Sequence, residues 1–205
     1  MGEIALLSVR QLPAAAGVLA RAFVEDPMMV YLMPDASRRP RVLTNYFGSV
    51  LRQAGRAGVL SAVSEGDVPV GVSIVMPFGS YPLPILPQLA EWRTIVRAGA
   101  RSTVRNFRDL APIDRARPGE PFEYLMFLGS EPAQQGHGHG ARLLRHFLER
   151  SEDVGRTAYL VTMLESNVEW YRHFGFEVAR ELRMGRRGPR AWSLARVSGV
   201  RTSPG

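Results

Sequence analysis

Hydrophobic residues change their spacing along this 205-residue chain, and each change predicts a different element. Apolar side chains recur every three to four positions in residues 13–26 and again across residues 42–51, which indicates two amphipathic helices. The segment between them, framed by Pro27 and Pro34, predicts a short bend. Residues 58–77 then hold two β-rich runs around a Glu-Gly-Asp turn, which predicts a hairpin.

Two near-continuous apolar runs dominate the second half of the chain. FEYLMFLGS (residues 122–130) and TAYLVTML (residues 157–164) are typical of strands buried on both faces. A glycine-rich loop and an amphipathic helix lie between them. A short helix over residues 167–174, ended by Gly175, and a hairpin over residues 176–197 complete the pattern. The order predicts a mixed α and β fold whose centre is a strand–loop–helix–strand unit.

The pattern predicts a single domain over residues 1–198. It is interrupted at residues 77–118, where a proline-rich stretch and one or two amphipathic helices form an insert between strands. Residues 199–205 are expected to be a flexible tail. The length allows one domain with a sizeable core and leaves little room for a second.

Composition narrows the chemistry and the location. The chain has no cysteine, which excludes disulfides, zinc–thiolate sites and a cysteine nucleophile. An early Glu3, with Arg10 and Pro13 interrupting the apolar run, argues against a signal peptide. No apolar stretch is long enough to span a membrane, so we expect a cytoplasmic protein with no membrane partner.

The formal net charge of +7 comes entirely from arginine on the basic side. A basic chain favours an anionic partner, but the arginines are scattered and the longest runs are pairs. We therefore expect no nucleic-acid partner, and note that a small anionic cofactor suits the same charge.

The loop AQQGHGHGARLL (residues 133–144) carries the candidate chemistry. A metal site on its histidines lacks acidic or sulfur ligands nearby in sequence, so none is expected. Residues 136–141 formally match G-x-G-x-x-A. However, six residues separate this motif from the strand, and only one strand–helix pair follows it, which does not suit a dinucleotide fold. A P-loop is excluded because no Gly-Lys-Ser/Thr occurs.

Two interpretations of the loop remain at this level. It is either a turn that joins a strand to a helix, or a cradle whose backbone N–H groups bind a pyrophosphate. Glycines permit close approach of the backbone to a ligand, and the dipole of the following helix favours an anion.

Two motifs in a fixed order favour the cradle. Gln135 to Gly140 fit Q/R-x-x-G-x-G/A, and Asn167, Tyr171, Gly175 and Phe176 follow as N-x-x-x-Y-x-x-x-G-F. Together they resemble the GNAT superfamily of N-acetyltransferases, across about residues 121–180. A looser likeness in RAFVEDPMMVYLMPD, GVSIVMPFGSYPLP and the loop itself is similar to the branch that contains puromycin N-acetyltransferase.

The resemblance implies an α+β fold and a cofactor site. The expected fold is a central mixed, largely antiparallel sheet of six to seven strands, flanked by helices and splayed at its central strands. Acetyl-coenzyme A would be the co-substrate, with no metal. The backbone of Leu128, Gly129 and Ser130 would hold the pantetheine arm, and the first N–H would polarise the thioester carbonyl. The expected pyrophosphate cradle is formed by the amides of Gln135, Gly136, His137, Gly138, His139, Gly140 and Ala141.

Four side chains are candidates for binding and proton transfer. The resemblance implies that Asn167 hydrogen-bonds the cofactor arm and that Tyr171 protonates the leaving thiolate. The base is either Glu123, whose apolar surroundings would raise its pKa, or Glu165 at the end of the next strand. The alternative for Glu123 is an ion pair with an arginine.

The resemblance implies an acetyl-coenzyme A-dependent N-acetyltransferase that acts by direct attack in a ternary complex. Its expected acceptor is the amine of a small molecule, under a roof formed by residues 81–107 with Trp92 and Phe107 as aromatic walls. The alternative is a non-catalytic acyl-coenzyme A sensor, which needs the cradle but neither acid nor base. The C-terminal hairpin is a candidate homodimer interface, while the identity of the amine, the acyl-chain preference and the oligomeric state stay open.

Overall fold

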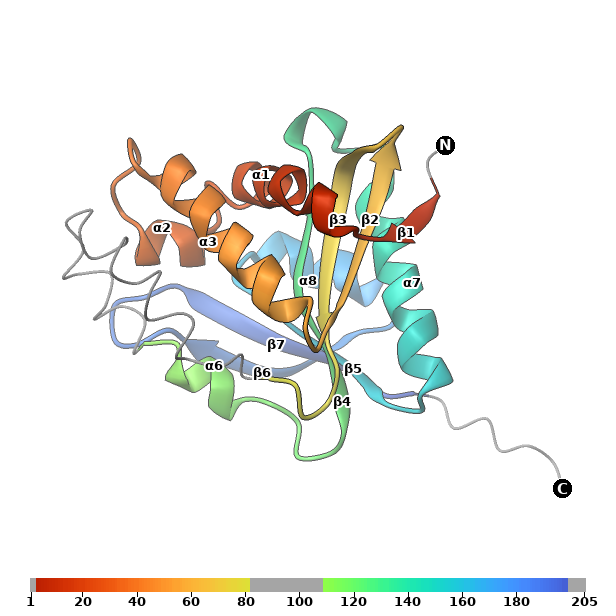
Figure 1. Ribbon diagram of the computed structural model, residues 1–205. Helices are drawn as coiled ribbons and strands as arrows, with labels where there is room; N and C mark the ends of the chain where they lie inside the picture. Colours follow the sequence, from red (N-terminus) through yellow and green to blue (C-terminus); the bar gives the residue numbers. More distant parts are fainter. Residues whose placement is uncertain (1–2, 82–108, 199–205) are drawn as a thin grey trace, which may run out of the picture.

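The computed structural model describes residues 3–81 and 109–198, and its strands form one sheet in the order β1-β2-β3-β4-β5-β7-β6 (Figure 1). Only β4 and β5 run parallel, and every other neighbouring pair is antiparallel. The strands are β1 (Ile4–Leu6), β2 (Val59–Glu65), β3 (Val68–Met76), β4 (Phe122–Ser130), β5 (Thr157–Thr162), β6 (Glu177–Arg183) and β7 (Arg190–Arg196). This confirms the predicted α+β fold with a largely antiparallel sheet.

Helices cover both faces of the sheet, with α1 to α3 on one side and α7 on the other (Figure 1). The α-helices are α1 (Leu12–Ala22), α2 (Pro27–Leu32), α3 (Arg39–Ala54), α6 (Ala111–Arg115), α7 (His139–Asp153) and α8 (Glu165–Arg172). Two short 3-10 turns, η1 (Val9–Gln11) and η2 (Pro132–Gln134), precede α1 and α7. The predicted bend after Pro27 is in fact α2, because the Asp26 carboxylate caps it by accepting from the amides of Met28 and Met29.

The hydrophobic core has two main parts, one on each face. On the first face, Phe23 at the C-cap of α1 and Phe47 of α3 pack around Phe127 of β4, with ring centroids 5.4 and 5.0 Å from it. On the second face, Phe147 of α7 packs with Phe176. Both of these side chains are 1% exposed. The amphipathic spacing in the sequence therefore assigns the helices correctly to their buried faces.

The sheet opens between its two parallel strands. Residues 122–125 of β4 pair with residues 157–160 of β5, but β4 continues to Ser130 without β5 beside it. The register of β4 against β3 also shifts between Phe127 and Leu125, so Met126 is an extra residue in β4 and forms a β-bulge. The predicted splay thus begins at this bulge.

The predicted insert at residues 77–118 is only partly described. Residues 82–108, which include Trp92 and Phe107, lie outside the described residues, as does the tail 199–205. The described flanks of the insert contain Tyr81 and α6. The domain boundaries and the roof over an acceptor site stay predictions.

Candidate functional site

Beyond the bulge, β4 has hydrogen-bonding groups on its β5 side that β5 does not reach. The amide of Glu131 donates to the Val70 carbonyl of β3 at 2.8 Å, and bonding alternates along an antiparallel ladder. Gly129, two residues earlier, therefore also directs its amide and carbonyl at β3. The backbone groups of Leu128 and Ser130 point the other way, into the splay, where an extended ligand arm can add as a strand.

Gly129 lies where α1 packs closely against β4. A Cβ at this position would lie 3.0 Å from the Ala22 Cβ and 3.1 Å from the Phe23 ring. The absence of a side chain lets α1 lie close against β4. Of the three residues predicted to hold a pantetheine arm, the ladder directs Leu128 and Ser130 to the splay and Gly129 to β3.

The glycine loop leads directly into α7. Gly136 and Gly138 have φ of +85° and +79°, a left-handed conformation that glycine adopts without strain. A Cβ at either position would meet nothing within 4 Å, so the space above the loop is open. Gly138 is the N-cap of α7, no side chain caps this helix, and its first four amides have no intrahelical partner. The geometry is that of an anion-binding helix start.

The two loop histidines lie in different environments. His137 is exposed, and its Nδ1 lies 3.2 Å from the Gln134 carbonyl and 3.3 Å from that of Gln135. His139 is 9% exposed, and neither of its buried ring nitrogens has a hydrogen-bond partner among the described residues. The two rings lie nearly parallel, with centroids 6.1 Å apart.

Helix α8 comes close to the first turn of α7 at Trp170. A Cβ added at Gly140 would lie 3.9 Å from the Ser130 hydroxyl and 3.9 Å from Cη2 of Trp170. The end of β4, the first turn of α7 and the indole of α8 therefore meet. Trp170 was not anticipated from the sequence, because its part in the site depends on how α8 packs against α7.

Asn167 and Glu165 lie in the first turn of α8, immediately after β5. The Thr162 hydroxyl at the end of β5 accepts from the Asn167 side-chain amide at 3.4 Å and from the Leu164 backbone amide at 3.2 Å. Thr162 thus orients Asn167. The signal in the sequence for this role is that Thr162 is a polar residue at the end of an apolar strand. Glu165 is exposed at the first position of the helix.

Tyr171 is 8% exposed and packs between Trp170 and Phe176, with ring centroids 4.9 and 5.7 Å away. Burial raises the pKa of its phenol well above the ordinary value, because the phenolate would lose its hydration. The phenol therefore keeps its proton at neutral pH and is available as a proton donor.

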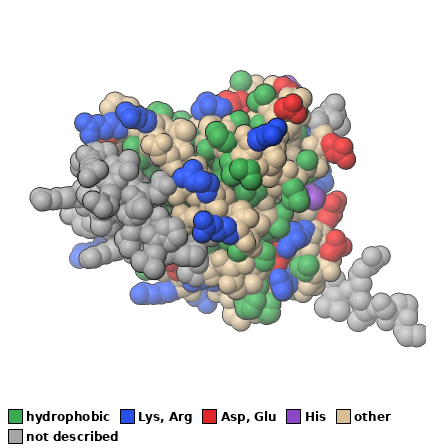
Figure 2. Space-filling model, viewed as in Figure 1, with side chains coloured by type: hydrophobic (Ala, Val, Ile, Leu, Met, Phe, Trp, Pro, Cys, Tyr) green, Lys and Arg blue, Asp and Glu red, His purple; other side chains and the backbone are tan. Residues whose placement is uncertain are grey.

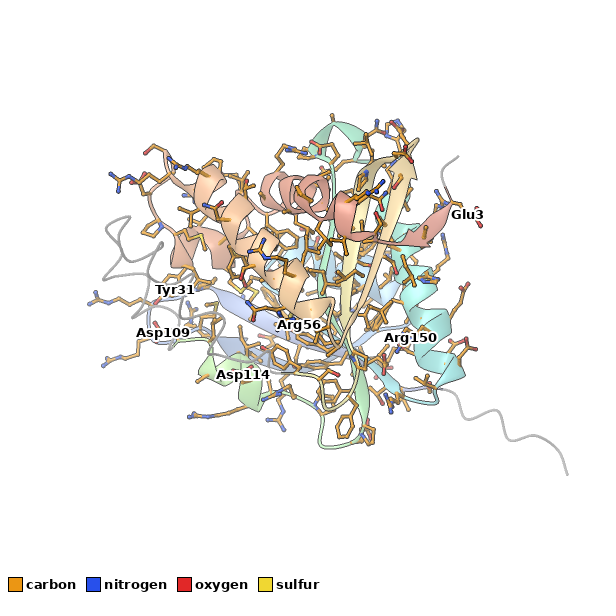
Figure 3. The ribbon with its side chains drawn as sticks, in the orientation of Figure 1. Glu3, Tyr31, Arg56, Asp109, Asp114 and Arg150 are labelled. Carbon is orange, nitrogen blue, oxygen red and sulfur yellow. The ribbon has the colours of Figure 1, made fainter. Side chains whose placement is uncertain are left out.

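Glu123 lies at the opposite end of β4 from the splay. It is 0% exposed, and its two carboxylate oxygens accept from Arg150 Nε at 3.1 Å and Arg156 Nη1 at 2.8 Å. Five residues separate it from Leu128, about 15 Å along a strand. Figure 3 shows Arg150 on α7. Of the two open interpretations of this residue, the structure shows the ion pair with arginine.

Neither a metal cluster nor a membrane span is found in the part of the chain that the structure describes. No group of three or more His, Cys, Asp or Glu side chains there is arranged to hold a metal ion. None of the described helices is long and apolar enough to cross a membrane. On the face drawn in Figure 2, basic side chains are interspersed with acidic and apolar ones.

Comparison with known proteins relates this fold to those of known acetyltransferases. No protein-family model matches the chain. An uncharacterised N-acetyltransferase of Schizosaccharomyces pombe is 24% identical over 180 residues, which cover 79% of this chain and 69% of the yeast protein. A Corynebacterium glutamicum structure described as histone acetyltransferase HPA2 and related acetyltransferase superposes with a TM-score of 0.74 at 20% identity, covering 99% of this chain and all of that one. The chain therefore has the fold of the GNAT N-acetyltransferases.

Two further solved structures share the GNAT fold. The Drosophila melanogaster polyamine N-acetyltransferase, which forms N-acetylagmatine, has a TM-score of 0.62 at 15% identity and covers 95% of this chain and 99% of its own. The PaiA N-acetyltransferase of Thermoplasma acidophilum, solved with coenzyme A, has a TM-score of 0.59 at 11% identity, with 96% and 99% covered. The likeness to the puromycin N-acetyltransferase branch stays a prediction.

The residues of this chain fit coenzyme A. A thiol-bearing arm with amide groups needs unpaired backbone groups along a strand, which Leu128 and Ser130 supply in the splay. A pyrophosphate needs converging N–H donors with room for the anion, which the uncapped start of α7 and the open space at Gly136 and Gly138 supply.

Proposed function

We propose that the chain is a GNAT N-acetyltransferase that transfers the acetyl group of acetyl-coenzyme A to the amine of a small molecule, by direct attack in a ternary complex. The observation that carries the proposal is the convergence of the open edge of β4, the uncapped start of α7 and the first turns of α8. Each supplies one requirement of acyl transfer: a carbonyl-polarising donor, an anchor for the cofactor and a proton donor.

The cofactor is held mainly by backbone. Leu128 and Ser130 bind the amide-bearing arm, with the Leu128 N–H donating to the thioester carbonyl oxygen. The amides at the start of α7, from Gly138 to Ala141, bind the pyrophosphate with the loop residues Gln135 to His137 around it. Asn167, oriented by Thr162, hydrogen-bonds the arm from the α8 side. Acetyl-coenzyme A supplies the activated acetyl group as a thioester.

Proton transfer divides between two residues of α8. Tyr171, whose buried phenol is protonated at neutral pH, donates its proton to the leaving sulfur. Glu165, exposed at the start of α8, accepts the proton of the attacking amine, directly or through a water. Glu123 is not proposed as the base because both of its oxygens are engaged by arginines far from the splay. A sensor without turnover would need neither Tyr171 nor Glu165.

The face of the sheet opposite α7 supports a cationic amine as acceptor. Asp109 accepts from the Tyr31 hydroxyl at 2.7 Å, and Asp114 accepts from that of Tyr81 at 3.0 Å. Figure 3 shows Tyr31 and Asp109 beside one another, with Asp114 near them on α6. Carboxylates next to aromatic rings stabilise ammonium groups.

A row of aromatic rings connects Tyr81, which donates to Asp114, with the central strands β4 and β5. The Tyr81 ring lies 5.0 Å from that of Tyr124 on β4, which lies 5.5 Å from Tyr159 on β5. A diamine with one ammonium at a carboxylate would pack its hydrocarbon chain against these rings. The polyamine substrate class of the Drosophila protein agrees with this proposal.

The test is an acceptor screen with acetyl-coenzyme A, in which thiol release and product mass are measured. We expect diamines and polyamines to be acetylated faster than monoamines, and Asp109→Asn to raise KM for a diamine with little change in kcat. Asp35→Asn, an exposed carboxylate before α3, is the matched control. Acetylation of peptide N-termini alone would contradict the small-molecule acceptor, and cofactor binding without turnover of any amine would favour the sensor.

A further inference from the structure

The tautomer of His137 is set by two backbone carbonyls. Its Nδ1 lies within hydrogen-bond distance of the carbonyl oxygens of Gln134 and Gln135. Carbonyl oxygens only accept hydrogen bonds, so Nδ1 must carry a hydrogen to bind either of them. In a neutral ring Nε2 is then an acceptor with a lone pair, and it becomes a donor only when the ring takes up a second proton.

The same ring belongs to the predicted pyrophosphate cradle. His137 lies between Gly136 and Gly138, the two glycines with positive φ, and is exposed above the uncapped start of α7. A pyrophosphate is fully ionised near neutral pH and offers only acceptor oxygens. A neutral His137 would therefore present a lone pair to an anion, whereas the imidazolium would present an N–H donor and a positive charge.

We propose that His137 takes up one proton when coenzyme A binds, and that its Nε2–H then donates a hydrogen bond to a pyrophosphate oxygen. The inference rests on the proposed cofactor site. The step is a proton binding from solvent to Nε2, with no covalent bond to the cofactor formed or broken. By linkage, the complex holds this proton to a higher pH than the free protein does, so affinity rises as the pH falls.

The second loop histidine supports a ligand at this place. His139 is nine-tenths buried at the first position of α7, and both of its ring nitrogens have no partner among the described residues. Its ring lies nearly parallel to that of His137. A dianionic group beside these rings would provide the compensating charge for protonation of His137.

Other charged groups border the loop and are included in the test. They are His139 and Arg142 on α7, Glu131 with its partner Arg21 on α1, and Glu65 of β2, whose carboxylate accepts from the Gln134 side chain. Glu131 already has its positive partner, with Arg21 Nη2 at 2.7 Å from Oε2. The remaining negative group, Glu65, favours protonation of the loop rather than opposing it.

The experiment is calorimetric titration of the full chain with dephospho-coenzyme A at several pH values, each in two buffers of different ionisation enthalpy. This probe keeps the pyrophosphate and lacks the 3′-phosphate, which itself titrates near neutral pH. The difference in apparent enthalpy between buffers gives the number of protons taken up. We expect uptake approaching one proton near pH 7.5, and a Kd roughly twentyfold tighter near pH 6 than near pH 8.

Three variants sharpen the result. His137→Asn should abolish the uptake and flatten the pH dependence of Kd. His137→Arg carries a permanent charge and should bind without uptake, and at least as tightly near pH 8 as the native chain. His173→Asn is the matched control, because His173 is also exposed with Nδ1 at a backbone carbonyl, that of Glu169 at 2.7 Å, but lies at the end of α8. It should leave the uptake unchanged.

The outcomes separate the inference from the function on which it rests. Binding with no proton uptake, or uptake that survives in His137→Asn, would overturn the role of His137 and leave the cofactor site intact. If the uptake is lost in His139→Asn but kept in His137→Asn, the proton binds to His139, and this result would also overturn the role of His137. No binding of the probe or of coenzyme A at any pH would overturn the proposed cofactor site itself.

Discussion

The two halves of β4 differ in their pairing: the first is hydrogen-bonded to strands on both sides, and the second on one side only. Residues 122–125 pair with β3 on one side and β5 on the other, and contain the buried Glu123 with its two arginines. Residues 126–130 begin with the bulge at Met126 and pair with β3 alone. The first half closes the sheet, and the second leaves backbone donors and acceptors unpaired at a place where a ligand can use them.

The difference indicates which groups of β4 are free to bind a ligand. Within the closed half, hydrogen bonds on both sides satisfy the backbone, so only side chains could bind a ligand, and Glu123 is already engaged. In the open half the backbone itself is the proposed binding group. Changes in the closed half should therefore alter stability, and changes around the open half should alter binding and turnover.

The largest expected effect is that of Tyr171→Phe. We expect kcat to fall by about 100- to 1000-fold, because the variant lacks the proton donor for the leaving sulfur, while the Kd for coenzyme A stays within about twofold. Steady-state kinetics and calorimetry measure the two quantities. Tyr46→Phe, on the opposite face, is the control. Unchanged turnover in Tyr171→Phe would remove the tyrosine from the mechanism.

Substitution of Glu165 should affect turnover, whereas substitution of Glu123 should affect stability. Glu165→Gln should lower kcat roughly 30-fold and remove the acidic limb of the pH–rate profile, because the amide cannot accept the proton of the amine. Glu169→Gln, on the same helix and paired with Arg172, is the control that should keep both. A native profile in Glu165→Gln would reject this residue as the base.

Glu123→Gln should instead reduce stability. We expect the free energy of unfolding to fall by roughly 2 kcal/mol, since a buried ion pair is broken while its half-exposed arginines retain some hydration. Denaturant unfolding measures this loss, and the pH–rate profile should stay native. Loss of the acidic limb in this variant would reverse the contrast between the two ends of β4.

Gly138→Ala tests the cradle next to the open half. Its φ of +79° predicts backbone strain of about 1 kcal/mol, and the new Cβ would project into the open space where the pyrophosphate is expected. We expect coenzyme A to bind about tenfold more weakly. Gly66→Ala in the β2–β3 turn, with φ of +58° and the same open surroundings, should be strained without any loss of affinity.

The smallest expected effect per residue is the loss of stability at alkaline pH caused by the buried tyrosines of the paired segment of β4 and β5. Burial raises the pKa of Tyr159 to about 12 and that of Tyr124 well above its usual value, so the folded state keeps protons that the unfolded chain loses near pH 10. Above pH 10 the unfolded state binds fewer protons, and stability falls as the pH rises. We expect a loss of roughly 1 kcal/mol for Tyr159 between pH 10 and 11. Tyrosinate absorbance together with denaturant midpoints measures it, and a flat stability up to pH 11 would contradict it.

Much of the fold could be predicted from local pattern. The apolar runs of residues 122–130 and 157–164 predicted the two central strands, and the spacing in residues 13–26 predicted α1, because periodicity follows directly from which face is buried. The bend at Pro27 was mispredicted because the capping of α2 depends on a single side chain, that of Asp26. The glycines of the loop also predicted a turn with backbone freedom, and Gly136 and Gly138 do have a positive φ, which is a local requirement.

The sequence by itself determined the elements, the core faces and the loop where an anion would bind, because these depend on spacing and on backbone freedom. Only the tertiary structure decided which half of β4 is open, since the bulge at Met126 exists only in the register against β3. It also decided that Glu123 meets two arginines and that Trp170 of α8 reaches Gly140. Contacts between residues far apart in the chain are set by how the helices pack on the twisted sheet, and no local pattern encodes that packing.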